Sequence, residues 1–147
     1  MTTTANSASP GKAMSRPWLR HLLVSIAAIG TVLLIGLPPW GDNPPMGWIF
    51  LFLAGVYLVM ALVRRQWIGL QLIGVALFGA IAVISAYWQS DVAIWLAGAA
   101  WFLHGVWDLV HYRANQVVAR WYSEWCTIVD MIFGILILGY AVIRLGG

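Results

Sequence analysis

The chain has 147 residues, of which 62% are hydrophobic and 9% are charged. A soluble domain carries about 25% charged and about 45–50% apolar residues, so this composition indicates an integral membrane protein with no room for a soluble catalytic domain. The net charge of +3 does not indicate a nucleic-acid partner, because the basic residues lie beside apolar segments, as topology signals do. The single cysteine, Cys126, excludes an intramolecular disulfide and a CxxC pair.

The first 15 residues are rich in Thr, Ser and Ala and contain little that could pack in a core. This composition predicts a disordered tail on the cytoplasmic side for residues 1–15. Residues 16–147 are predicted to form a single transmembrane bundle.

Five segments are long and apolar enough to cross the hydrocarbon core of a membrane, which takes about 20 mostly apolar residues. The sequence therefore predicts an all-α, polytopic transmembrane helical bundle with five membrane-spanning helices. Their predicted limits are Trp18–Leu37, Gly47–Val63, Trp67–Trp88, Val92–Tyr112 and Trp125–Ile143. The loop at 38–45 contains four prolines and cannot be helical, the links at 64–66 and 89–91 are tight, and the link at 113–124 is expected to be longer.

The orientation follows from the positions of the Lys and Arg residues. If the N-terminus is cytoplasmic, only Arg144 is outside, and seven basic residues are inside: Lys12, Arg16, Arg20, Arg64, Arg65, Arg113 and Arg120. Because cytoplasmic loops carry the excess of Lys and Arg, the sequence predicts an N-in, C-out protein. The expected location is the inner (plasma) membrane of a bacterial-type cell, with the lipid bilayer as the main partner.

Three ionisable residues lie in the inner half of the fourth apolar segment: His104, Asp108 and His111. Their spacings of four and three place them on one stripe of a helix. A carboxylate near the middle of a bilayer costs about 2.5–3.5 kcal/mol on insertion scales, so such a residue normally faces a partner or a water-filled cavity. The sequence therefore predicts a polar pocket at this stripe.

The fifth segment contributes Asp130 at the depth of Asp108 when the two helices are antiparallel. We expect the two carboxyl groups to lie within about 8 Å of each other, because a helix rises ~1.5 Å per residue. Asp130 also has a simpler interpretation. If the helix begins after an N-cap at Ser123, Asp130 lies about one turn inside it, where the helix dipole favours a negative charge.

The residues leave three interpretations of the stripe open. It could be a structural clamp between helices, whose polar contacts are worth about 0.6–2 kcal/mol. It could be a metal site for zinc, iron or manganese, with ligands from His104, Asp108, His111 and Asp130, although the two histidines lie about 10 Å apart along one helix. It could also perform acid–base or proton chemistry, with His104, Asp108 and Asp130 as the catalytic groups, so the sequence leaves open whether the protein is an enzyme. A haem between His21 and His111 is a further hypothesis.

The core His104-Gly-Val-Trp-Asp-Leu-Val-His111, followed by Arg120-Trp-Tyr-Ser-Glu-Trp-Cys126 and an Asp-bearing helix, resembles a pattern in small uncharacterised bacterial multi-span membrane proteins. The resemblance covers the last two apolar segments and implies no activity. The preferred prediction is an inner-leaflet His/Asp pocket that binds a metal or handles protons on a lipid-soluble or small substrate. The alternative is a non-catalytic subunit or assembly partner of a larger membrane complex, built with other membrane subunits or a second copy of the chain.

Overall fold

The computed structural model describes residues 17–36, 46–87 and 91–146, which form five helices and, within these ranges, no strand. The helices are α1 (Pro17–Gly36), α2 (Met46–Arg64), α3 (Ile68–Tyr87), α4 (Asp91–Ala114) and α5 (Arg120–Gly146). The prediction of an all-α fold is confirmed. The predicted tail at 1–15, the proline-rich loop at 38–45 and the link from residue 88 to 90 lie outside the described residues.

Four of the helices contain segments long and apolar enough to cross a membrane: Pro17–Leu34, Ile68–Ser85, Asp91–Ala114 and Arg120–Arg144. Leu51–Arg64, in α2, is a shorter apolar helix. The outward faces are rich in large apolar side chains; Leu34 and Ile143, for example, are 82% and 78% exposed. Such surfaces suit a lipid environment, in which an exposed apolar side chain carries no penalty.

The boundaries of α4 and α5 correct the prediction for this part of the chain. The expected long link at 113–124 is only residues 115–119, because α4 continues to Ala114 and α5 already begins at Arg120. Ser123 is therefore not an N-cap but lies inside α5, where its hydroxyl donates to the carbonyl of Arg120 at 3.2 Å. Hydropathy marks where a helix leaves the apolar layer, and a helix can continue past that point as long as its backbone bonds are made.

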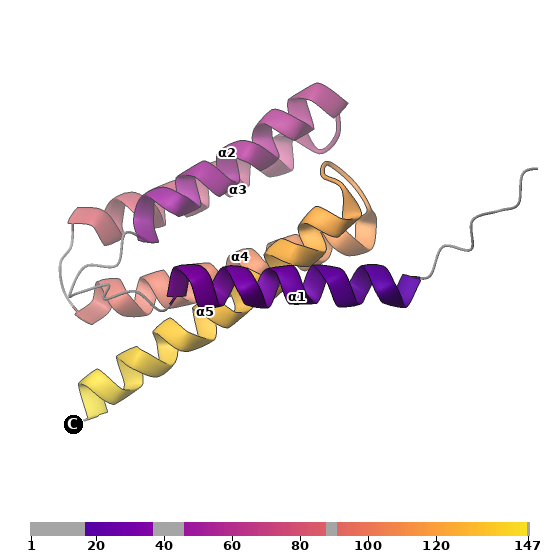
Figure 1. The fold of residues 1–147 in the computed structure, drawn as a ribbon. Helices are drawn as coiled ribbons and strands as arrows, with labels where there is room; N and C mark the ends of the chain where they lie inside the picture. The colour runs from indigo at the N-terminus through magenta and orange to yellow at the C-terminus, as the bar shows by residue number, and fades with distance from the viewer. Residues whose placement is uncertain (1–16, 37–45, 88–90, 147) are drawn as a thin grey trace, which may run out of the picture.

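The five helices are arranged around the pair formed by α4 and α5, which has the most extensive packing in the molecule. The α2–α3 hairpin lies on one side of this pair and reaches it mainly through α3 (Figure 1). Among the described residues, α1 packs against α5 alone. The largest core cluster joins residues of all five helices, including Ala28, Ala54, Phe78, Trp101 and Phe133.

Glycines permit the close approach of α4 and α5. A Cβ at Gly134 would lie 2.6 Å from the backbone nitrogen of Phe102, and one at Gly105 would lie 3.0 Å from the backbone nitrogen of Met131. Backbone atoms cannot move aside as a flexible side chain can, so these two positions require the absence of a side chain. The close crossing brings the polar residues of the two helices within reach of each other.

One end of the bundle collects the basic residues. The α2–α3 and α4–α5 turns meet there, where the side-chain oxygen of Gln66 accepts a hydrogen bond from the backbone of Val117 at 2.9 Å. The start of α1 joins them, because Arg20 pairs with Glu124 of α5 at 3.8 Å. We call this the basic end, after the arginines that the described helices and turns place there: Arg20, Arg64, Arg65, Arg113 and Arg120. At the opposite end, Arg144 pairs with Asp91 at 3.5 Å.

Candidate metal centre

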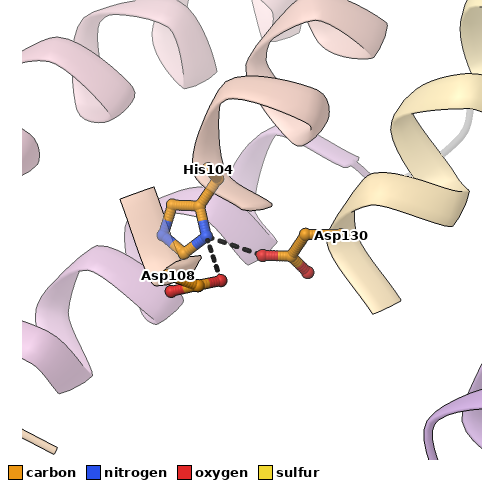
Figure 2. Close-up of side chains that lie close together, drawn as sticks. All are labelled: His104, Asp108 and Asp130. Carbon is orange, nitrogen blue, oxygen red and sulfur yellow. Dashed lines mark hydrogen bonds and ion pairs between the residues drawn. The ribbon is translucent and has the colours of Figure 1, made fainter. Parts of the chain in front are cut away.

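A histidine and two carboxylates meet between α4 and α5 (Figure 2). His104 and Asp108 lie one turn apart on α4, and Asp130 reaches them from α5. The Nδ1 atom of His104 donates to Asp130 Oδ2 at 2.6 Å and lies 3.4 Å from Asp108 Oδ2. The expected proximity of Asp108 and Asp130 is confirmed, since one ligand atom from each of the three residues lies within 4.8 Å of the others.

The three side chains are almost completely buried. His104 is 1% exposed, Asp108 0% and Asp130 2%. In the described part of the chain, neither carboxylate has an ion pair with a Lys or Arg side chain. With both carboxyl groups ionised, even a protonated imidazole leaves the group with a net negative charge, whereas a divalent cation held by a neutral imidazole and two carboxylates gives a net charge of zero. Buried charges need such compensation, because water is not available to solvate them.

Asp108 has unused bonding capacity. Both of its carboxyl oxygens are buried without a hydrogen-bond partner among the described residues. A carboxylate can accept several hydrogen bonds or bind a cation, and leaving a buried charged acceptor unsatisfied is unfavourable by well over the ~1–3 kcal/mol of a neutral group. The donor set therefore fits a metal ion, which would bind the Asp108 oxygens that have no hydrogen bond within the described ranges.

The type and spacing of the donors also suit a cation. One imidazole and two carboxylates match the ligand preferences of zinc, iron and manganese. Bonds of about 2.0–2.2 Å place the ligand atoms of a tetrahedral zinc ion roughly 3.3–3.5 Å apart. The 2.6 Å contact between His104 and Asp130 would widen by less than about 1 Å on binding, and the imidazole proton at Nδ1 would be released.

His111 was predicted as a further ligand, but the structure places it in a separate hydrogen-bonded group. Its Nδ1 donates to the carbonyl oxygen of Trp107 at 2.9 Å, and its Nε2 lies 2.8 Å from the side-chain nitrogen of Gln71. Since an amide nitrogen only donates, Nε2 is the acceptor and the ring is the neutral Nδ1–H tautomer. With both nitrogens occupied, His111 lies outside the group of three candidate ligands.

The helix-dipole interpretation of Asp130 does not hold. Because α5 begins at Arg120, Asp130 lies ten residues inside the helix, almost three turns. The field of the helix end falls off within the first turn, so it gives no stabilisation at this depth. The partner of Asp130 is His104, whose Nδ1 lies 2.6 Å from Asp130 Oδ2.

Aromatic rings surround the centre. Phe78 of α3 lies edge-on to His104, with centroids 4.8 Å apart, and Tyr57 of α2 lies 6.1 Å from the same ring. The ring of Trp107 completes this aromatic wall, with its centroid 6.1 Å from that of Phe78 and 5.5 Å from that of His111. The hydroxyl of Tyr57 in an otherwise apolar segment is a signal that a sequence can carry. The sequence carries no such signal for Phe78, which looks like any other apolar residue of its helix.

The haem hypothesis gains no support, because His111 has hydrogen bonds at both ring nitrogens and His21 has other partners. The Nδ1 atom of His21 instead pairs closely with Glu124 and joins the start of α1 to α5. Charge at the basic end thus positions α1 rather than a cofactor.

An apolar groove elsewhere in the described helices does not reach the centre. It lies between α2 and α3, has a volume of about 530 Å³, is open and apolar, and is lined by Leu51, Val75, Ala76, Gly79, Ala80, Val83 and Ile84. None of the three candidate ligands contributes to it. A substrate bound in this groove would not touch the His/Asp group.

Comparison of the chain with family models, with curated proteins and with solved structures gave no match. The resemblance carried by the His104–His111 motif therefore depends on that motif alone. Any assignment of function has to come from the geometry of the site.

Proposed function

We propose that this protein is a small polytopic membrane protein that binds one divalent metal ion between α4 and α5. His104, Asp108 and Asp130 are the proposed ligands, with Asp108 at the centre, and zinc, iron and manganese are the candidate ions. The observation that carries the proposal is the Asp108 carboxylate, which is fully buried beside two other potential ligands and whose two oxygens have no hydrogen bond from the described part of the chain.

Burial favours a bound ion over acid–base chemistry on a lipid-soluble or small substrate. A general acid or base must come within hydrogen-bond reach of its substrate, about 2.6–3.2 Å. All three ligand side chains are at most 2% exposed, and the groove between α2 and α3 does not include them. A metal ion needs far less space than an organic substrate, so the closed site suits it better.

The proposed setting is a bacterial-type plasma membrane crossed five times, with the N-terminus in the cytoplasm and the C-terminus outside. The arginines of the basic end support this orientation, because Arg20, Arg65 and Arg113 belong to three separate helix ends that lie on one side. Asp108 lies six residues before the end of α4, or about 9 Å along the helix axis. The metal centre would then lie in the half of the bundle nearer the cytoplasm.

A second candidate function is that of a non-catalytic subunit or assembly partner in a larger membrane complex, with the polar stripe as a clamp. The group around His111 favours it, because the hydrogen bonds to Trp107 and Gln71 satisfy that ring completely and join α3 to α4. This interpretation explains His111 well. It leaves Asp108 without a hydrogen-bond partner.

The test is the metal content of the full-length protein purified from membranes, measured by inductively coupled plasma mass spectrometry. We expect about one zinc, iron or manganese ion per wild-type chain and none in Asp108→Asn. Asp91→Asn is the matched control, since Asp91 lies on the same helix but its side chain is 51% exposed at the opposite end. The control should retain the ion.

The Asn substitution separates the two candidate functions. It keeps an acceptor and removes a buried charge, so a clamp would tolerate it in expression level and thermal stability. Loss of the ion from a variant that still inserts and folds supports the metal centre. A wild-type protein that is metal-free after purification and after incubation with each of the three ions would contradict it.

A further inference from the structure

A phenol from α2 lies against the candidate metal centre. Tyr57 is 1% exposed, and its ring lies edge-on to both His104 and His111, with centroids 6.1 and 4.9 Å away. Its hydroxyl interacts electrostatically with Asp108. Tyr57 therefore reaches into the layer between α4 and α5 although α2 itself packs mainly against α3.

The hydroxyl of Tyr57 is a hydrogen-bond donor and the carboxylate of Asp108 is an acceptor, and neither has a partner among the described residues. Tyr57 Oη and both oxygens of Asp108 are buried without a hydrogen-bond partner among the described residues. The phenol has one proton to donate and the carboxylate can only accept. Donation from the phenol to one oxygen of Asp108 would satisfy both groups and leave the other oxygen for a metal ion.

We propose that Tyr57 is the positioning residue of the metal centre, which holds the Asp108 carboxylate in its ligating orientation by donating a hydrogen bond to it. The inference rests on the proposed metal site and adds a contact from α2 to ligands that belong to α4 and α5. Carboxylate ligands are commonly held in this way. Loss of such an outer partner typically weakens metal binding about 10–100-fold.

Tyr122 provides a matched comparison. Its ring centroid lies 6.2 Å from that of Tyr57, but its side chain is only partly buried and its hydroxyl interacts mainly with Cys126. The change from Tyr to Phe removes the same hydroxyl at both positions and preserves the ring packing. Only Tyr57 is expected to affect the ion.

The experiment uses the full-length protein in detergent, stripped of metal and titrated with Co²⁺, with visible absorption as the readout. Zinc competition then gives the zinc affinity. We expect Tyr57→Phe to weaken binding of both ions about 10–100-fold and to change the Co²⁺ absorption bands. Tyr122→Phe is expected to bind with the affinity and spectrum of the wild type. The absorption bands report the geometry of the ligands around Co²⁺. A variant that is less stable but still folded would keep the bands of the wild type.

The outcomes that would contradict the role of Tyr57 can be distinguished from those that would contradict the metal site. A wild-type chain that binds neither Co²⁺ nor zinc would contradict the metal site itself and, with it, the role of Tyr57. A wild-type chain that binds them, together with a folded Tyr57→Phe variant of unchanged affinity and spectrum, would contradict only the role of Tyr57. Equal losses in Tyr57→Phe and Tyr122→Phe would also contradict it.

Discussion

At the scale of single residues, Asp108 poses the main energetic question. A carboxylate in the apolar part of a membrane protein is costly, and interhelical polar contacts are usually too weak to offset that cost. Asp108 has a 3.4 Å contact with His104 and no hydrogen bond among the described residues. A bound cation would supply the missing compensation.

Metal binding should therefore stabilise the folded protein. At a free zinc concentration about 100 times its dissociation constant, binding to the folded state alone adds about 2.7 kcal/mol. We expect zinc to raise the apparent melting temperature of the wild-type protein in detergent and EDTA to reverse the shift. Asp130→Asn should show no zinc-dependent shift, because the amide can still accept from His104 but is a poor metal ligand. An equal shift in Asp130→Asn would indicate that the ion binds elsewhere.

His111 should behave as a structural residue. Gln71→Leu removes the donor to its Nε2 and leaves a buried acceptor without a partner, which we expect to destabilise the protein by ~0.6–2 kcal/mol with no change in metal content. Unfolding in detergent, followed by circular dichroism, measures the first effect. The double variant Gln71→Leu/His111→Leu should recover part of the stability, because both polar partners are then gone. Loss of the ion in Gln71→Leu would contradict this prediction and indicate that His111 is a metal ligand.

At the scale of helices, the polar residues depend on how closely α4 and α5 approach. The sequence predicts which residues share a helical stripe and which lie at one depth, since both follow from the rise and period of a helix. The sequence alone was therefore sufficient to predict that His104, Asp108 and Asp130 lie close together. The distance of about 10 Å between His104 and His111 also follows from the helix rise, but the hydrogen-bond partners of His111 could not be predicted, because they depend on the positions of Gln71 and the Trp107 carbonyl in the packed structure.

The close packing of α4 and α5 predicts that Gly134 cannot be replaced by a larger residue without loss of stability. A methyl group there would lie 2.6–2.8 Å from atoms of Phe102, two of them backbone atoms, so Gly134→Ala forces the helices apart. We expect a loss of about 1–3 kcal/mol of unfolding free energy and a lower metal content, because Asp130 moves away from His104. Both quantities are measured on the detergent-purified protein.

Gly139 supplies the control on the same helix. A Cβ at this position meets nothing within 4 Å, so Gly139→Ala should be neutral or slightly stabilising through the better helix propensity of Ala, by up to about 1 kcal/mol. Similar losses at the two glycines would show that the effect of Gly134 does not arise from the helix crossing.

Helix ends were the least predictable elements. The prediction placed the start of the fifth helix near Trp125, whereas α5 begins at Arg120 and carries Ser123 and Glu124 inside it. Polar residues in the terminal turns of a helix give the same hydropathy pattern as a loop. They mark only where the helix leaves the apolar layer. The pairing of Glu124 with His21, which joins α5 to α1, could not be foreseen from either segment alone.

At the scale of the whole molecule, the basic end unites helix termini that are far apart in the sequence. Apolar composition and the spacing of the breaks between segments were sufficient to predict an all-helical chain with its helices in this order. The tight link at 64–66 indicated the hairpin of α2 and α3, but the pattern did not predict that α1 packs on α5, since uniformly apolar helices carry little information about their neighbours.

The orientation of the molecule can be measured with reporter fusions. The gathering of basic residues at one end predicts that a reporter after Gly147 behaves as periplasmic and one inserted after Arg65 as cytoplasmic. Alkaline phosphatase and green fluorescent protein report the two sides, and each should be placed at both positions. The reversed pattern would move the metal centre to the outer half of the membrane.

The most direct test of the account is X-ray absorption spectroscopy of the zinc-loaded protein at the zinc edge. The proposed ligands His104, Asp108 and Asp130 predict a first shell of nitrogen and oxygen atoms at about 2.0–2.2 Å with a single imidazole. A sulfur atom at about 2.3 Å would implicate Cys126, and a second imidazole would implicate His111. Either result would contradict the proposed centre.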